Sequence, residues 1–347
     1  MGEGPPILIR CDGSPEIGFG HVVRCLALAD ELRYDYRCRV VFAMRRGREG
    51  FDAVRAKGYP VLTPVEEGSP FDQARWIEGA IAGVGAKALV LDVRDDLRRE
   101  DVERLRGSGT LIALVDDLSD RRLAADIAFY PPIPQVERLD WTGFGGKLRV
   151  GWDVVLLRME FSRCAREEPA ARPLVLVTMG GSDPAGMTLK ALRALDLLEE
   201  DFETLAILGP GFLHGEALSG LLAGGRRRCE VMRDIKDMAA VMVQADLAVA
   251  SFGVTAYELA AAGVPAIHLC LTEDHAESAA GLVREGAAVS MGVHGRVTEQ
   301  ELAGTVARLL ADEPARKRMG ERARNAVDGR GAERIAREIL GRIGGGG

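Results

Sequence analysis

Residues 7–24 of the chain read ILIRCDGSPEIGFGHVVR, a pattern that predicts a β-strand, a glycine-rich turn and a helix. The apolar run from Ile7 is typical of a buried strand, and Gly18 and Gly20 permit a tight turn with no side chain above it. The apolar residues that follow recur at helical spacing: Val22, Val23, Leu26, Ala29 and Leu32. This order is how a strand–turn–helix unit of an α/β fold begins.

His21 falls in the first turn of this expected helix. Unpaired N–H groups at a helix start favour negative charge, and a histidine exchanges protons near neutral pH. The turn therefore suits an anionic or sugar-like ligand. The alternative is that His21 only caps the helix.

The bulk properties describe a globular protein of about two domains. The chain has 347 residues, 47% of them hydrophobic, and a net charge of -7, which argues against a general nucleic-acid binder. No apolar run is long enough to cross a bilayer, and Met1–Pro6 does not resemble a signal peptide, so we expect a cytoplasmic protein. The six cysteines form no C-x-x-C pair and the five histidines do not cluster, so we predict reduced thiols and no metal site.

Strand-like and helix-like segments alternate in both halves of the chain. The alternation predicts parallel sheets, and it is interrupted across 151–172, a charged and irregular stretch whose later part we interpret as a linker. We predict an α/β protein with two Rossmann-like domains facing a cleft, with ligands at the carboxyl ends of the strands. The expected domains are 1–160 and 173–330, followed by a helix and a flexible glycine tail in 331–347.

The second half contains two strand–turn–helix motifs. Gly180, Gly181 and Ser182 follow an apolar strand, so their N–H groups suit a phosphate, although an ordinary tight turn gives the same pattern. In the stretch 245–265, a strand ends at Ser251 and a helix carries Glu258 about one turn in. That carboxylate suits a ribose diol, and its alternative role is to favour its own helix start.

Charged residues follow several other predicted strands. Asp92, Asp116 and Asp117 suit sugar hydroxyls or a role beside His21, or they cap the next helices. His275 is expected at the same strand edge as Ser251, with Asp274 either orienting it, binding sugar hydroxyls or capping a helix. We interpret 226–228, a run of three arginines, as a solvated turn, with weak contact to an anionic membrane surface as the alternative.

Three segments, 18–24, 178–184 and 245–265, resemble the UDP-sugar hydrolases of pseudaminic acid synthesis and the related spore-coat polysaccharide biosynthesis proteins. Both groups are similar to the glycosyltransferase that forms lipid II. The resemblance implies the two-domain GT-B glycosyltransferase architecture with UDP bound by the second domain, His21 as the catalytic residue, Glu258 on the ribose and the backbone of Ile235 reading uracil. It further implies a nucleotide site made of Gly180, Gly181, Ser182, Ile235, Met238, Ser251, Gly253, Val254, Thr255 and Glu258.

The chain departs from the hydrolases at two places. Arg94 stands where they tend to have a tyrosine, and Asp274–His275 replaces a usual Asn–Gln pair, which leaves UDP binding intact but changes the sugar site. The residues expected to bind the rest of the substrate are Asp12, Gly18, Gly20, Arg24, Asp92, Arg94, Asp274 and His275.

The main functional prediction is hydrolysis of a UDP-linked amino-deoxy sugar, with His21 as general base and no cofactor. An inverting glycosyltransferase, in which an acceptor hydroxyl replaces water, shares every motif. A catalytically silent nucleotide-sugar binding protein is the third reading. No oligomeric state is predicted.

Overall fold

The computed structural model describes residues 4–14, 18–45, 48–64, 71–165 and 171–344. Contacts divide the chain into two compact units. The first contains 1–159 and 330–347, and the second contains 160–329. Each unit has one sheet in which every paired strand is parallel.

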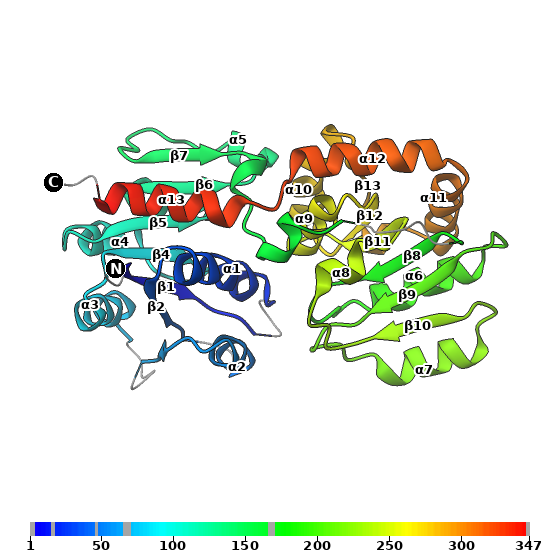
Figure 1. The fold of residues 1–347 in the computed structure, drawn as a ribbon, viewed down its shortest axis with the longest axis horizontal. Coiled ribbons are helices and arrows are strands. Elements are labelled where there is room, and N and C mark those ends of the chain that lie inside the picture. Colours follow the sequence, from blue (N-terminus) through cyan, green and yellow to red (C-terminus); the bar gives the residue numbers. More distant parts are fainter. Residues whose placement is uncertain (1–3, 15–17, 46–47, 65–70, 166–170, 345–347) are drawn as a thin grey trace. The chain divides into compact units, whose positions relative to one another are not determined.

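The sheet of the first unit has the strand order β3-β2-β1-β4-β5-β6-β7 (Figure 1). Ile7 and Ile9 pack on one face with helices α1 and α13, while Leu8 packs on the other with α3 and α4. The elements are β1 (Gly4–Cys11), α1 (Gly20–Tyr34), β2 (Cys38–Ala43), α2 (Arg48–Ala56), β3 (Val61–Leu62), α3 (Gln73–Val84), β4 (Ala88–Asp92), α4 (Arg99–Arg106), β5 (Leu111–Val115), η1 (Asp120–Ala124), β6 (Ile127–Tyr130), α5 (Pro134–Glu137), β7 (Lys147–Val150), η2 (Trp152–Val154) and α13 (Gly331–Gly344).

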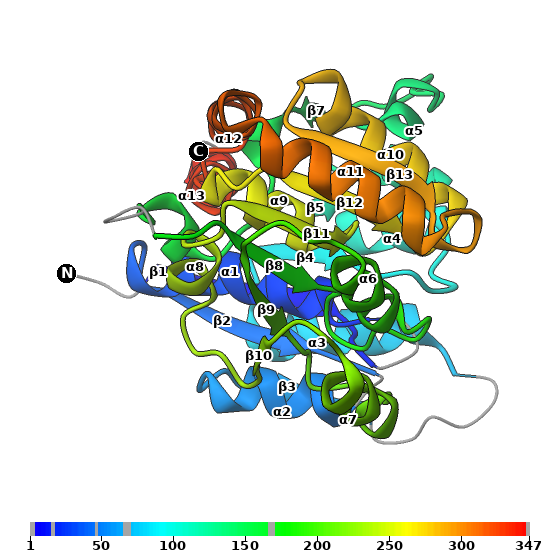
Figure 2. The same cartoon turned by 90° about the vertical axis from the view of Figure 1, so that its right-hand side faces the viewer.

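The sheet of the second unit has the order β10-β9-β8-β11-β12-β13. Helices α6 and α11 pack together on one of its faces, as Figure 2 shows, and α9 contacts both β11 and β12. The elements are η3 (Met159–Ser162), which spans the boundary, β8 (Leu174–Thr178), α6 (Met187–Asp196), β9 (Glu203–Ile207), α7 (Gly215–Gly224), β10 (Cys229–Met232), α8 (Met238–Met242), β11 (Leu247–Ser251), α9 (Val254–Ala262), β12 (Ala266–Cys270), α10 (Glu273–Arg284), β13 (Ala288–Val293), η4 (His294–Arg296), α11 (Glu299–Ala311) and α12 (Glu313–Ala326).

The structure corrects the sequence analysis in three local details. Gly18 has a positive φ of 80° and makes the turn, but Gly20 is already the first residue of α1. His275 lies inside the first turn of α10 and not before it. The C-terminal helix α13 is part of the first unit, because Ile335 and Ile339 pack into the core that contains Ile7. Of the expected glycine tail, 344–347, Gly344 is the last residue of α13, whereas 345–347 lie outside the described residues, as do 166–170 of the expected linker.

None of the helices in the described residues combines the length and the apolar character needed to span a membrane.

Candidate functional site

One candidate site, in the first unit, lies where β1, β4 and β5 end. Because these strands are parallel neighbours, the residues that follow them share one edge of the sheet. Asp92 is the last residue of β4 and pairs in register with Cys11 of β1. Its carboxylate is 1% exposed, whereas the side chains of His21 and Arg24 from α1 are each 15% exposed. A ligand can therefore reach the side chains of His21 and Arg24 but not the carboxylate beneath them.

Asp92 receives hydrogen bonds from three residues of α1. Its Oδ1 lies 2.6 Å from Nδ1 of His21, and its Oδ2 accepts from Nε of Arg24 at 2.6 Å. Arg24 also donates from Nη2 to Oδ1 at 2.5 Å, which completes a two-pronged ion pair. The thiol of Cys25 donates to Oδ2 at 3.4 Å. His21 and Arg24 meet one carboxylate because residues three apart share a helix face.

This geometry keeps the carboxylate of Asp92 charged and assigns a tautomer to the neutral imidazole of His21. Burial by itself would raise the pKa of Asp92, but the adjacent Arg24 and His21 outweigh it and hold the pKa well below its usual value. An ionised carboxylate only accepts hydrogen bonds, so the proton of the neutral ring is assigned to Nδ1 of His21. Nε2 then carries the lone pair, and His21 can accept a proton there.

Two consecutive aspartates after β5 have different roles. Asp116 has a positive φ of 53°, and its Oδ2 accepts from Nη1 of Arg24 at 2.9 Å. Asp117 is buried and turns away from Arg24, accepting from the backbone N–H of Ser119 at 2.8 Å and from Arg121. From the sequence, binding and helix capping are equal alternatives for both aspartates, and neither is among the predicted site residues. The adjacent acids were the available signal, but the backbone conformation that separates them is not encoded in residue type.

The remaining first-unit candidates are less clearly placed for binding. Oδ2 of Asp12 accepts from Arg10 at 2.7 Å, and Oδ1 accepts from the backbone N–H of Arg45 at 2.7 Å, so both oxygens already have protein donors. Arg94 is exposed in the loop after β4. No ion pair links Arg94 to another residue in the ranges that the structure describes. Substrate contact by Asp12 and Arg94 stays a prediction.

A second candidate site lies at the corresponding edge of the second unit, after β8, β11 and β12. Ser251 ends β11, Phe252 and Gly253 form the turn, and α9 starts at Val254. Within the described residues no side chain caps this helix start, and its first turn holds no acidic residue. The N–H groups at Val254 and Thr255 are therefore suited to an anion.

The start of α6 differs from that of α9. The carboxylate of Asp183 accepts from the backbone N–H groups of Met187 at 2.8 Å and Thr188 at 2.9 Å. The preceding Gly180–Ser182 turn adopts a positive φ of 77° at Gly180, next to the hydroxyl of Ser251. A phosphate at the first turn of α6 would lie against the carboxylate of Asp183. In this segment only the backbone amides of the Gly180–Ser182 turn therefore suit a phosphate.

The other second-unit candidates lie in segments that follow β10, β11 and β12 along the chain. Glu258 is buried on α9, 5% exposed, and Ile235 is half-buried in the loop between β10 and α8, which starts at Met238. The His275 ring lies near Phe252, with 6.4 Å between the ring centroids. Thr272 caps α10 by accepting from the N–H of His275, so neither Glu273 nor Asp274 has that role. In the described part of the chain, no three His, Cys, Asp or Glu side chains are grouped to hold a metal ion.

The chain resembles glycosyltransferases in sequence and in fold. No family model matches it. It is 26% identical over 343 residues to the spore coat polysaccharide biosynthesis protein SpsG of Bacillus subtilis (strain 168), an alignment that covers 94% of this chain and 95% of that protein. It is 32% identical over 365 residues to the UDP-N-acetylglucosamine--N-acetylmuramyl-(pentapeptide) pyrophosphoryl-undecaprenol N-acetylglucosamine transferase of Halorhodospira halophila (strain DSM 244 / SL1), covering 91% and 94%.

Among solved structures, that of Acinetobacter baumannii MurG matches with a TM-score of 0.70 at 18% identity, covering 96% of this chain and 99% of the other. A similarity at this identity shows the fold, and the two parallel-sheet α/β units are those of the GT-B glycosyltransferases. The predicted fold class is thereby confirmed. The resemblance to the spore-coat proteins and to the lipid II-forming enzyme is confirmed as well.

Proposed function

The chain belongs to the family of the UDP-N-acetylglucosamine--N-acetylmuramyl-(pentapeptide) pyrophosphoryl-undecaprenol N-acetylglucosamine transferases, and we propose that it transfers the sugar of a UDP-sugar to an acceptor hydroxyl in polysaccharide biosynthesis. The relative SpsG, named for spore coat polysaccharide biosynthesis, supports that context. The observation that carries the proposal is the contact between His21 and the buried, ionised Asp92 at the strand edge of the first unit.

In the proposed reaction, Nε2 of His21 takes the proton of the acceptor hydroxyl as its oxygen bonds to the anomeric carbon. The bond from that carbon to the diphosphate oxygen breaks, the electron pair leaves with UDP, and the configuration inverts. Asp92 holds the ring in the required tautomer and stabilises the imidazolium that forms. Arg24 keeps Asp92 ionised and, with Asp116, fixes its orientation.

The second unit is proposed to bind the nucleotide. The free N–H groups at the start of α9 and the amides of the Gly180–Ser182 turn suit the diphosphate, since donors fixed by the fold stabilise the charge that grows on the leaving group. The buried Glu258 is proposed to accept from the ribose hydroxyls, and the backbone at Ile235 to read the base. The name of the Halorhodospira relative includes UDP-N-acetylglucosamine, which makes this UDP-sugar the first to test.

Hydrolysis, the main prediction from the sequence, differs only in the nucleophile, with water replacing the acceptor. The relatives support transfer better, because the Halorhodospira protein is named a transferase and SpsG is named for polysaccharide biosynthesis, while neither is named a hydrolase. Amino-deoxy sugars of the pseudaminic acid type remain candidate substrates only through the resemblance. A silent binding protein is the third outcome.

One experiment separates the three outcomes. UDP release from UDP-N-acetylglucosamine and a panel of UDP-sugars is measured with and without undecaprenyl-diphosphate-linked N-acetylmuramyl-pentapeptide as acceptor. Release that depends on acceptor supports transfer, release without acceptor supports hydrolysis, and UDP binding without release supports the silent protein. His21→Asn is the matched variant: it should bind UDP normally and lose turnover, and normal turnover would exclude His21 from the chemistry.

A further inference from the structure

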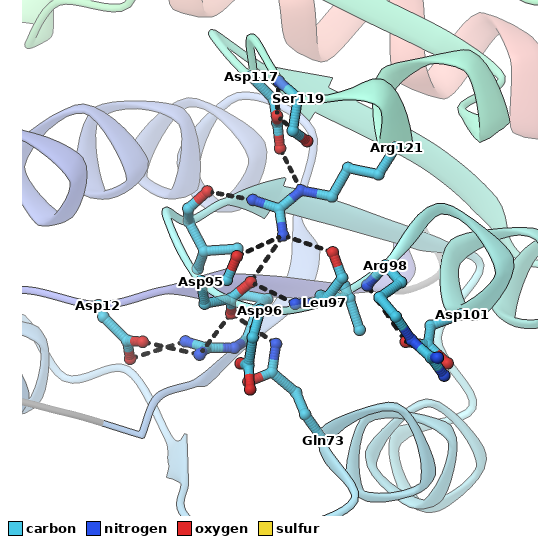
Figure 3. Close-up of polar contacts among 12 residues, drawn as sticks. Asp12, Gln73, Asp95, Asp96, Leu97, Arg98, Asp101, Asp117, Ser119 and Arg121 are labelled. Atoms are coloured by element: carbon cyan, nitrogen blue, oxygen red, sulfur yellow. Dashed lines mark hydrogen bonds and ion pairs between the residues drawn. The ribbon is translucent and has the colours of Figure 1, made fainter.

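A chain of buried charges runs through the first unit next to the candidate site (Figure 3). Arg10, in β1 and fully buried, pairs with Asp12 at 2.7 Å and with Asp95 at 3.3 Å. Asp95 in turn accepts from Nη1 of Arg121 at 2.6 Å, and Arg121 pairs through Nε with Asp117. Asp12, Asp95 and Asp117 follow β1, β4 and β5, so the charges join the three loops of the site edge.

Arg121 makes most of these links. Besides the two carboxylates, its Nη2 donates to the carbonyl of Val93 at 2.6 Å and its Nη1 to that of Leu97 at 3.0 Å. The side chain is 3% exposed. One guanidinium from η1 thus ties down both ends of residues 93–97, the loop that directly follows Asp92.

Arg121 contacts Val93 and Asp117, the residues that directly follow Asp92 and Asp116. Val93 follows Asp92, and Asp117 follows Asp116, so each anchored position is one residue from a carboxylate that binds Arg24. Burial alone would raise the pKa of Asp95, but Arg10 and Arg121 outweigh it and lower it, so the charges stay in place at neutral pH. A lysine could not reproduce the contacts, because its single ammonium lacks the planar set of donors.

We propose that Arg121 is a positioning residue: through the loops after β4 and β5 it sets the orientation of Asp92 and Asp116, and through them that of His21. Its effect on turnover rests on the proposed function, whereas its effect on the His21 hydrogen bond does not. Arg121 touches no reacting atom in this proposal.

Arg122 provides a matched control on the neighbouring position. It is also buried, 6% exposed, and belongs to the same short helix. It donates to the carbonyls of Ser119 at 2.7 Å and Leu118 at 3.4 Å. Its Cζ also lies over the ring of Trp141, 5.2 Å from the ring centroid. Among the described residues it makes no hydrogen bond to 93–97. Its loss removes a buried arginine without releasing the loop after Asp92.

The test compares Arg121→Met, Arg121→Lys and Arg122→Met in the full chain. The ring ¹⁵N signals of His21, assigned by their absence in His21→Asn, report its hydrogen bond to Asp92 without any substrate. We expect both Arg121 variants to shift these signals and Arg122→Met to leave them unchanged. In turnover of UDP-N-acetylglucosamine with the same undecaprenyl-linked acceptor, Arg121→Met should lower kcat by about ten- to a hundredfold with KM for the UDP-sugar unchanged.

The outcomes separate the two proposals. Wild-type protein without turnover, combined with shifted His21 signals in both Arg121 variants but not in Arg122→Met, would overturn the function and support the positioning role. Three results would overturn the positioning role. The His21 signals could be unshifted in Arg121→Met, they could shift equally in Arg121→Met and Arg122→Met, or Arg121→Lys could restore their wild-type positions. If Arg121→Met fails to fold, Asp117→Asn removes only the charge that pairs with Arg121. The ring ¹⁵N signals of His21 are then compared between this variant and the wild type.

Discussion

The strand-end edges of the two units differ in chemistry. In the first unit, carboxylates and arginines interlock around His21, and the central carboxylate, Asp92, is buried and ionised. In the second unit, the loop after β8 contains Gly180 and Gly181, the turn after β11 is Phe252–Gly253, and within the described residues α9 starts with neither an acid nor a side-chain cap. A charged edge fixes the tautomer of a proton carrier, whereas an uncapped helix start leaves donors for an anion. The difference suggests a division between proton transfer and nucleotide binding.

The largest expected effect tests the charged edge. Asp92→Asn keeps the shape but removes the charge, so the ring of His21 can adopt the wrong tautomer and its imidazolium loses its counter-ion. We expect kcat to fall by about 10³- to 10⁴-fold, with UDP affinity by calorimetry unchanged. Arg24 keeps its pairing with Asp116, and the unfolding midpoint checks that the variant folds. A kcat near that of the wild type would remove the Asp92–His21 pair from the mechanism.

A second prediction concerns His268, the fully buried histidine of β12. It contrasts with His21, whose ring contacts the carboxylate of Asp92. Among the described residues no carboxylate pairs with His268, and burial lowers its pKa from 6.5 to about 4. The unfolded chain then binds the proton more readily, so this group's contribution to stability is intact above pH 6.5 and is lost as the pH falls toward 4.

The loss amounts to roughly 3 kcal/mol over that window. Urea unfolding of the wild type and of His268→Met gives the free energy of unfolding of each protein between pH 7 and pH 4. The contribution of His268 is the difference between the two proteins in how much of this free energy is lost. Because methionine does not titrate, the variant should lose less stability on acidification. Parallel curves for the two proteins would show that His268 is protonated as easily in the fold as in the unfolded chain.

The third prediction tests the neutral edge at the start of α9. Val254→Pro removes one N–H at the first helical position, where proline fits the helix. If that N–H binds the diphosphate, UDP affinity should fall by about ten- to a hundredfold, since a hydrogen bond to a charged group contributes about 1.5–3 kcal/mol. Glu299→Pro, at the first position of α11 in the same unit, is the control and should bind UDP normally. Equal loss in both variants would point to a general effect of proline.

The smallest effect concerns the capped start of α6. Asp183→Asn tolerates the positive φ of 45° but weakens the bonds to Met187 and Thr188. We expect a stability loss of about 1 kcal/mol by urea unfolding and no change in UDP affinity. A change in affinity as large as that of Val254→Pro would contradict the distinction between the two helix starts.

The sequence predicted the positions of helices and strands better than the roles of individual residues. Strands such as 88–92 and 174–178 were found because a buried parallel strand is a short apolar run, whatever its partners. The helix starts were harder, since Gly180–Ser182 and Ser251–Gly253 both read as glycine turns before a helix. The Asp183 cap on α6 depends on where its carboxylate points. In the part of the chain that the structure describes, no side chain caps α9 in this way.

Two α/β units follow from the alternation in the sequence, which also predicts a functional edge on each sheet and points first to His21. Only the tertiary structure separated Asp116 from Asp117 and joined His21, Arg24 and Asp92 across about 70 positions of the chain. It also showed that Arg10, within an apolar strand, belongs to a buried ion network. Periodicity records which face of an element is buried, but a charge acquires its role from the partner that folding brings to it.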